Sequence, residues 1–374
     1  MACGAMDLPK RSVAFLWPIV IFLIAFNLNL SNVHAQQSCS NPNGKTGECI
    51  SIYDCSSLVN SLKNLSRSAQ QTKFIQESQC GFSSPPFVCC TTDIDYAENS
   101  NELLPVGTQC GPQSIGNKIY NGNDTNIDEY PWMVLLEYRN KNGQLILNCG
   151  GSLINKRYVI TAAHCIKGQI ETEVGPLTRI RLGEYNINEE IDCIADDCNN
   201  KVVEVGFEQL IPHPQYDVRN GNNHHDIALI RLARDVEYSD FIRPVCLPLT
   251  DTRSAPINPG ELLVVAGWGR TLEARQSNVK KQLAIPVTDH DSCVRKYATK
   301  KVNLISSQLC AGGEFAKDSC DGDSGGPLMR QSHMKRWFLE GIVSFGNRCG
   351  LEGWPGVYTR VVDYIPWIKQ TVKP

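Results

Sequence analysis

The sequence predicts a mainly β fold, in which a barrel or sandwich follows a small module held together by disulfides. Two observations indicate this. Six cysteines fall within Cys39–Cys90, and from residue 110 onward short β-type runs are separated by Gly, Pro and Asn. Helical periodicity is absent until Tyr364–Val372, which predicts a C-terminal helix. The β-type runs are Trp132–Tyr138, Tyr158–Ala162, Ile180–Leu182, Ile227–Leu232, Leu262–Trp268 and Phe338–Phe345.

Composition narrows the class of function. The chain has 374 residues, a formal net charge of −3 and 42% hydrophobic residues. The near-neutral balance argues against a nucleic-acid partner, and the hydrophobic content is too low for several membrane spans. The 17 cysteines point to an oxidising, extracellular environment, because the cytosol keeps thiols reduced.

The N-terminus has the pattern of a secretory signal peptide over residues 1–35. A basic start precedes the apolar run Val13–Phe26, and small Ala35 stands at a cleavage-type position. An uncleaved membrane anchor is the alternative, although the run is short for a bilayer span and contains Pro18. No later segment would span a membrane. Cleavage would remove Cys3 from the 17 cysteines and leave 16, an even number that can pair completely.

The cysteine-rich module, residues 36–90, has the spacing C-x9-C-x5-C-x24-C-x8-C-C. Adjacent Cys89 and Cys90 should bond to different partners, because a bridge between neighbours is strained; spacing alone leaves the pairing open. A zinc site is the competing interpretation, but the nearest histidine, His34, belongs to the signal. The polar, acidic residues 91–109 that follow predict an exposed linker.

Three motifs in the β-rich region carry candidate chemistry. They are Thr161–Cys165 (TAAHC), Asp226–Leu229 (DIAL) and Gly322–Pro327 (GDSGGP). A serine hydroxyl is a weak nucleophile that needs a neighbouring base, and a histidine base needs a carboxylate to orient it. The chain order His, Asp, Ser is that of chymotrypsin-like proteases.

On these motifs, residues 119–374 resemble an S1-family, trypsin-like serine protease domain, and residues 39–90 resemble a clip domain. The whole chain is similar to arthropod clip-domain proteases of the easter and prophenoloxidase-activating type. The resemblance implies a chymotrypsin-like double β-barrel with a C-terminal helix, preceded by the small disulfide-rich clip domain. Residues 91–118 would then be the linker and the end of the activation peptide.

The resemblance also implies the catalytic roles. Ser324 would be the nucleophile, His164 the general base and then acid, and Asp226 the orienting carboxylate. The main-chain N–H groups of Gly322 and Ser324 would form the oxyanion hole. His224 and His225 precede Asp226; a metal site is one interpretation of this His-His-Asp string, and neighbours of a buried carboxylate are the other.

Substrate preference follows from Asp318, which matches the base of the primary specificity pocket. A buried carboxylate there favours Arg or Lys from the substrate, and Gly346 and Gly356 match the glycines of the pocket wall. An ordinary surface aspartate is the alternative interpretation.

The chain resembles a zymogen that is cut between Lys118 and Ile119. The new α-ammonium of Ile119 would pair with Asp323 and organise the oxyanion hole and the pocket. Lys118 and Asn121 stand where the family usually has Arg and Gly. Lys118 implies a trypsin-like upstream protease as activator.

By resemblance, all sixteen remaining cysteines pair. The expected disulfides are Cys39–Cys89, Cys49–Cys80, Cys55–Cys90, Cys110–Cys246, Cys149–Cys165, Cys193–Cys198, Cys293–Cys310 and Cys320–Cys349. Cys110–Cys246 would tether the clip domain and linker to the protease after cleavage.

A calcium site is a further expectation from related proteases. Carboxylates of Glu184 and Asp192 and carbonyls of Asn186 and Glu189 would be the ligands, because calcium prefers oxygen. A solvated acidic loop is the alternative. Two further sites are sequence patterns for N-glycosylation, at Asn64 and Asn123, which also arise by chance.

The resulting hypothesis is a secreted protease of a haemolymph-like fluid, acting in an immune or developmental cascade. Its protein substrate would be a Toll-ligand cytokine precursor or prophenoloxidase, and a serpin would be its inhibitor. A non-catalytic clip-domain homologue that acts as a binding cofactor is the alternative, although such homologues typically lack the nucleophile.

Overall fold

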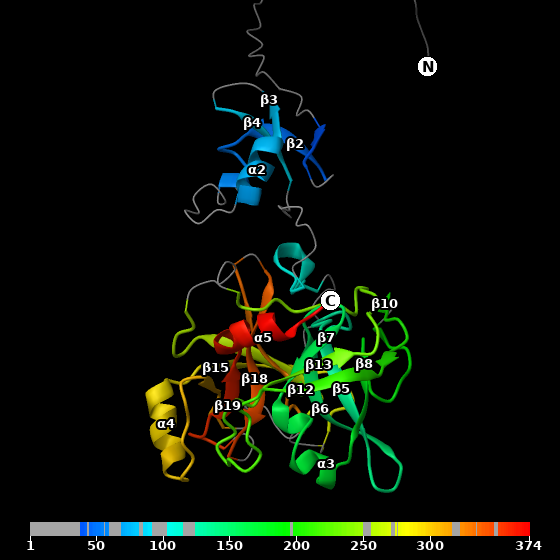
Figure 1. The fold of residues 1–374 in the computed structure, drawn as a ribbon, viewed down its shortest axis with the longest axis vertical. Coiled ribbons are helices and arrows are strands. Elements are labelled where there is room, and N and C mark those ends of the chain that lie inside the picture. The colour runs from blue at the N-terminus through cyan, green and yellow to red at the C-terminus, as the bar shows by residue number, and fades with distance from the viewer. Residues whose placement is uncertain are drawn as a thin grey trace, which may run out of the picture.

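The computed structural model describes residues 38–42, 45–55, 57–59, 69–81, 85–91, 103–114, 124–194, 197–249, 256–270, 274, 276–315, 322–333, 335–347 and 351–374. Figure 1 shows a small N-terminal unit in blue and a larger, β-rich unit coloured from cyan to red. None of the helices within these ranges is both long and apolar enough to cross a membrane.

The N-terminal unit contains an antiparallel sheet in the order β1-β2-β4-β3, together with helix α2 (Ala69–Glu77). Its core is small and includes Leu58, Phe74 and Val88. So few buried side chains stabilise a fold only weakly, and cross-links therefore have to add stability. The strands are β1 (Ser38–Ser40), β2 (Thr46–Ser51), β3 (Gln79–Gly81) and β4 (Phe87–Cys90).

The first large sheet has the order β11-β8-β5-β6-β7-β13-β12 over the described strands. β7 and β13 are antiparallel with Thr161 opposite Ala228, so the end of β7 lies beside the start of β13. This register positions the candidate site. The strands are β5 (Met133–Arg139), β6 (Leu145–Leu153), β7 (Tyr158–Thr161), β8 (Leu177–Leu182), β11 (Val203–Val205), β12 (Phe207–Pro212) and β13 (Ala228–Leu232).

The second large sheet has the order β15-β14-β17-β18-β19-β16, again over the described strands. These strands are β14 (Leu262–Gly267), β15 (Lys281–Pro286), β16 (Gln308–Ala311), β17 (Pro327–Gln331), β18 (Trp337–Phe345) and β19 (Gly356–Arg360). A short ribbon of β9 (Cys193–Ile194) and β10 (Asp197–Cys198) lies outside both sheets.

The two large sheets share one hydrophobic core. Fully buried Val134 and Ile160 of the first sheet belong to the same cluster as Met329 and Leu339 of the second. The indole N–H of Trp132 also contacts the sulfur of Met329 at 3.1 Å. The helical segments of this unit are η1 (Gly107–Gln109), η2 (Ala163–Cys165), α3 (Gln169–Glu173), α4 (His290–Ala298), η3 (Val361–Tyr364) and α5 (Ile365–Thr371).

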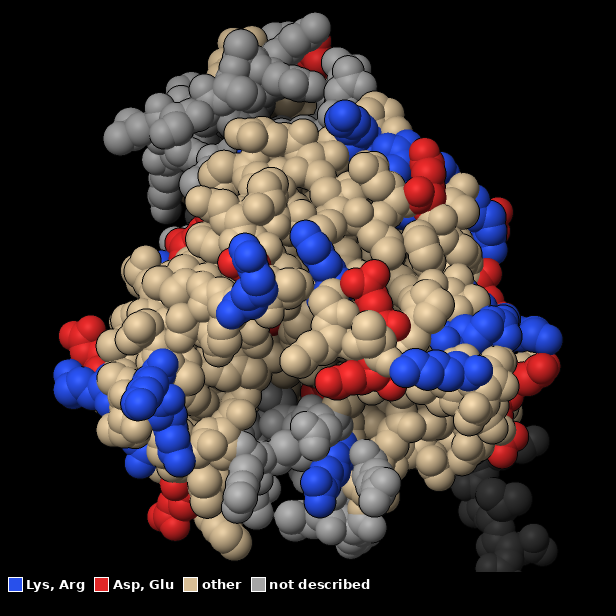
Figure 2. Space-filling view, turned by 60° about the horizontal axis from the view of Figure 1, so that its bottom comes forward, with Lys and Arg blue, Asp and Glu red and all other residues tan. Residues whose placement is uncertain are grey.

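The surface combines both signs of charge. Figure 2 shows acidic and basic side chains interspersed over one face of the molecule. Arg157 and Arg231 both bind the carboxylate of Glu208, each at 3.0 Å. Such exposed pairs neutralise each other locally and contribute little stability.

The predicted fold class is confirmed: the protein is mainly β, with two barrel-like sheets, a C-terminal helix and a disulfide-rich N-terminal unit. The six β-type runs correspond to β5, β7, β8, β13, β14 and β18. Helix α4 was not predicted. It is short, and Asp289 caps its N-terminus through Ser292 N–H at 2.8 Å.

Candidate active site

His164 and Asp226 come from elements that the first sheet brings together. His164 lies in η2 just after β7, and Asp226 lies just before β13. Nδ1 of His164 lies 2.7 Å from Oδ2 of Asp226, and the main-chain N–H of His164 donates to Oδ1 at 2.9 Å. The carboxylate therefore holds both the ring and the backbone of His164.

The second sheet supplies two more partners of Asp226, which is fully buried. The hydroxyl of Ser344 in β18 donates to Oδ2 at 2.5 Å, and the hydroxyl of Thr359 in β19 donates to the main-chain oxygen at 2.7 Å. A buried carboxylate requires a donor such as the hydroxyl of Ser344. Neither residue is predicted from the sequence, because no local motif marks partners 118 and 133 positions away.

The environment of His164 suits a general base. Burial lowers the pKa of the imidazole, but the charge of Asp226 and its hydrogen bond outweigh burial, so the net pKa is raised. The side chain is still 25% exposed. His164 also lies close to the sulfurs of Cys149 and Cys165, but these form a disulfide and offer no thiolate to a metal.

Glycines hold the segment around Ser324 against both sheets. Gly325 has φ +77°, and a Cβ there would lie 2.2 Å from Oγ1 of Thr161, three residues before His164. The carbonyl of Ser324 accepts the N–H of Gly150 in β6 at 2.8 Å, and the N–H of Gly325 donates to Val343 in β18 at 2.9 Å. The GDSGGP motif is thereby joined to β6 of the first sheet and to β18, the strand that carries Ser344.

The predicted oxyanion hole lies in the same segment. Gly322 has φ +96°, a conformation that favours glycine, and a Cβ there would lie 3.1 Å from Cα of Gly269. Over the described part of the chain, the main-chain N–H groups of Gly322 and Ser324 donate to no protein acceptor.

Asp323 occupies a cradle made of backbone. The N–H of Gly269 donates to Oδ1 of Asp323 at 2.8 Å. A Cβ at Gly267 would lie 2.0 Å from that oxygen, and a Cβ at Gly269 would also collide with the carboxylate. Lys118 and Ile119, the residues predicted to flank the activating cut, lie outside the described residues.

The predicted specificity pocket is described only in part. Gly356 opens β19, where it pairs with Ala311 of β16. A Cβ at Gly346, just after β18, would meet open space. Asp318, the predicted base of the pocket, lies outside the described residues.

The predicted calcium ligands lie in one loop. Glu184 and Asp192 are both buried, and Glu184 accepts a hydrogen bond from Arg181 at 2.7 Å. Burial raises the pKa of Glu184, Arg181 opposes this, and the charge of Asp192 raises it further. The carboxylate of Asp192 accepts the N–H of Asn186 at 3.2 Å, and the carbonyl of Asn186 accepts the N–H of Glu189 at 2.9 Å.

This donor set fits calcium. Two neighbouring buried carboxylates repel each other, and a cation between them would relieve that repulsion. The carbonyls of Asn186 and Glu189 add the hard oxygen ligands that calcium prefers.

Seven of the eight expected disulfides are present in the described ranges. They are Cys39–Cys89, Cys49–Cys80, Cys55–Cys90, Cys110–Cys246, Cys149–Cys165, Cys193–Cys198 and Cys293–Cys310. Cys320–Cys349 and the glycosylation sites Asn64 and Asn123 lie outside the described residues.

Comparisons with known proteins agree with this geometry. The family model described as "Trypsin" matches residues 119–368, and the model described as "Regulatory CLIP domain of proteinases" matches residues 39–90. Serine protease 7 of Drosophila melanogaster is 54% identical, with 92% of this chain and 95% of that protein covered. Phenoloxidase-activating factor 1 of Holotrichia diomphalia is 42% identical, with 93% and 97% covered.

Among solved structures, the crystal structure of the Drosophila Grass clip serine protease of the Toll pathway matches with a TM-score of 0.59. The two chains are 30% identical, and the match covers 90% of this chain and 97% of that one. The chain therefore belongs to the trypsin family of serine proteases and carries the regulatory CLIP domain of such proteinases.

Proposed function

We propose that this chain is a secreted zymogen of a serine endopeptidase that cleaves peptide bonds after Arg or Lys. The observation that carries the proposal is the hydrogen bond of 2.7 Å between His164 and buried Asp226. The segment that contains Ser324 packs through Gly325 against Thr161 of β7, the strand that ends just before His164.

We propose the following reaction for these residues. Oγ of Ser324 attacks the substrate carbonyl, and Nε2 of His164 takes the proton because Nδ1 already faces Asp226. The N–H groups of Gly322 and Ser324 stabilise the oxyanion. His164 then protonates the leaving amine, and water releases the acyl group by the reverse path. The raised pKa of His164 supports its part in both proton transfers.

Specificity and activation are part of the same proposal. Asp318 would select Arg or Lys, with Gly346 and Gly356 leaving room for the side chain. Cleavage between Lys118 and Ile119 would free an ammonium to pair with Asp323. The backbone cradle of Asp323 supports this, because it fixes the half-buried carboxylate beside Gly269.

The biological setting rests on the relatives. Their names connect similar chains with phenoloxidase activation and with the Toll pathway. We infer a secreted enzyme of a haemolymph-like fluid that is cut by an upstream protease and inhibited by a serpin. Its substrate would be prophenoloxidase or a Toll-ligand cytokine precursor.

The test uses the full-length zymogen, cleaved by an added trypsin-like protease. A fluorophosphonate should label the cleaved wild type and not Ser324→Ala, and Arg and Lys peptide substrates should be hydrolysed before aromatic ones. If the cleaved wild type is never labelled, the alternative of a non-catalytic binding cofactor replaces the proposal. Preference for aromatic substrates would remove only the role of Asp318.

We also propose that the loop from Glu184 to Asp192 binds calcium as a structural ion. Its support is the pair of buried carboxylates. When bound, calcium would neutralise them and add stability; it takes no part in the proposed chemistry.

A further inference from the structure

The residues before Asp226 have an unusual backbone. Asn223 has φ +46° and His225 has φ +58°, so two residues other than glycine adopt the left-handed conformation within three positions. Such conformations persist only where the surroundings hold them. His225 is joined directly to Asp226, so its backbone sets the position of that carboxylate.

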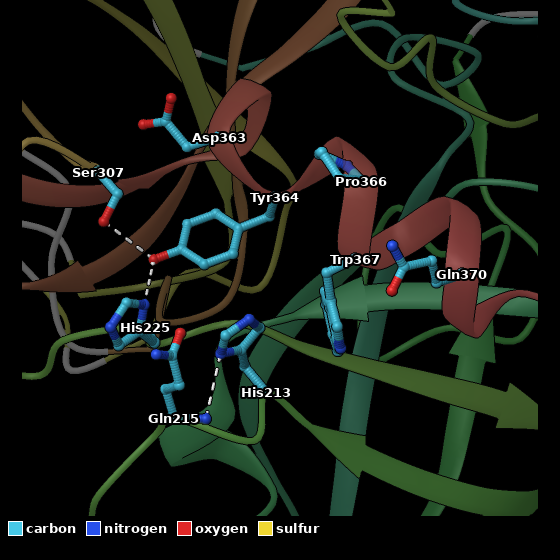
Figure 3. A pocket seen from close by; sticks show the side chains of 9 residues that line it. All are labelled: His213, Gln215, His225, Ser307, Asp363, Tyr364, Pro366, Trp367 and Gln370. Carbon is cyan, nitrogen blue, oxygen red and sulfur yellow. Dashed lines mark hydrogen bonds between the residues drawn. The ribbon is translucent and has the colours of Figure 1, made fainter.

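The side chain of His225 is held from two directions (Figure 3). Its Nδ1 lies 3.0 Å from the hydroxyl of Tyr364, and that hydroxyl donates to Oγ of Ser307 at 3.0 Å. On its other side the ring stacks on His213, with the ring centres 5.2 Å apart and the planes 20° from parallel. The ring of Trp367 packs edge-on against His213, with the two ring centres 5.0 Å apart.

The stacked rings are neutral at physiological pH. Burial, with a smaller effect from His225, lowers the pKa of His213 to about 4. Burial and the neighbouring His224 also lower the pKa of His225. Two protonated rings at this separation would repel each other, whereas two neutral rings pack.

These contacts join the two sheets. His213 and His225 belong to the chain that forms β12 and β13, whereas Ser307 precedes β16 and Tyr364 precedes α5. Gln308 of β16 adds to them, because its amide donates to the carbonyls of Asn222 and Asn223 at 3.0 and 3.3 Å. The residues that lead into Asp226 are thus held by Gln308 of β16 and by Tyr364 of η3.

We propose that His225 is a positioning residue for Asp226, clamped between His213 and Tyr364 so that the carboxylate keeps its position against His164. This inference rests on the proposed serine protease function. The other interpretation of the His-His-Asp string, a metal site, is not favoured. The Nε2 atom of His224 lies 2.6 Å from the main-chain carbonyl oxygen of Asn303, so this ring hydrogen-bonds elsewhere.

The outer side of this clamp opens into a pocket of about 340 Å³ that His213, His225, Tyr364 and Trp367 help to line. The four side chains pack on one another at its wall (Figure 3), and a variant that shortens one of them gains space instead of a clash. Substitution at His225 therefore tests the clamp rather than overpacking.

The experiment compares His225→Ala, His225→Gly, His225→Asn and Tyr364→Phe in the full-length, cleaved protein, with exposed His333→Ala as the control. Active-site titration normalises each rate. His225→Ala should lower kcat roughly tenfold to a hundredfold with KM unchanged. Its acid limb of kcat/KM should move to lower pH, because a displaced Asp226 stabilises the His164 cation less.

His225→Asn should recover most of the rate, because Asn tolerates the left-handed conformation and retains a hydrogen-bonding side chain. Tyr364→Phe keeps the ring packing, so it carries the test if His225→Ala does not fold. Wild-type kcat and pH profile in both His225→Ala and Tyr364→Phe would overturn the clamp. Full activity of His225→Gly would also overturn it, since the backbone conformation alone would then suffice.

A second readout separates this inference from the proposed function. The NMR signal of the His164 Nδ1 proton reports its hydrogen bond to Asp226 without any turnover. A shift of that signal in His225→Ala, and none in His333→Ala, supports the clamp even if the wild type is never labelled by fluorophosphonate. An unshifted signal would refute the clamp whatever the activity.

Discussion

Replacing Gly325 by alanine tests how the segment around Ser324 is held. Gly325 has φ +77°, and its missing Cβ would lie 2.2 Å from Oγ1 of Thr161 and 2.6 Å from the carbonyl of Gly150. Gly143 is a matched control, because it has φ +80° and nothing lies within 4 Å of its Cβ position.

The expected cost separates into two parts. A left-handed alanine costs about 1–2 kcal/mol, and both variants bear this cost. Overpacking in a well-packed site adds about 1–3 kcal/mol, and only Gly325→Ala bears it. The free energy of unfolding should therefore fall by about 1–2 kcal/mol in Gly143→Ala and by about 2–5 kcal/mol in Gly325→Ala.

Urea unfolding of the two variants measures this difference, and turnover of an Arg peptide substrate reports the displacement of neighbouring Ser324. Adding Thr161→Ala to Gly325→Ala should recover part of both losses, because it removes the nearer of the two atoms that the Cβ would meet. The reasoning fails if Gly325→Ala is no less stable than Gly143→Ala, or if the cleaved Gly325→Ala enzyme turns over at the wild-type rate.

Three more predictions follow from the same contacts. Asp226→Asn should lower kcat by on the order of 10⁴-fold and move the acid limb of kcat/KM to lower pH, because the raised pKa of His164 depends on that charge; an unmoved limb would contradict this. Calcium should raise the melting temperature more at pH 7.5 than at pH 5. The pKa of Glu184 is raised in the folded state, so without calcium the fold loses stability as the pH rises through that pKa and the carboxylate becomes charged. Glu184→Gln should reduce the calcium effect, and a melting temperature insensitive to calcium and chelator would exclude the site. Arg330→Met should cost about 3–5 kcal/mol of folding free energy by leaving Glu340, bound at 2.7 Å, as a buried charge. Adding Glu340→Leu should recover most of that loss in urea unfolding, and no recovery would show that packing, not charge, is responsible.

Part of the fold and of the candidate site can be predicted from short stretches of sequence. Six β-type runs became strands because alternation and turn residues act within a few positions, and the motifs around His164, Asp226 and Ser324 are local strings. Helix α4 is not predicted from the sequence, because only Cys293 and Tyr297 of its nine residues are buried, too few to give a clear helical period. The pairing of the cysteines followed from family resemblance and not from spacing.

The support of Asp226 is a matter of tertiary structure alone. Ser344 and Thr359 reach it from 118 and 133 positions away, and Tyr364 reaches His225 from 139 positions away. The local sequence around these residues does not predict these contacts, because a hydrogen bond between distant segments forms only once the two sheets have packed on one core. Local sequence motifs thus indicate which residues are candidates for catalysis, whereas the packing of the two sheets decides which other residues hold them in place.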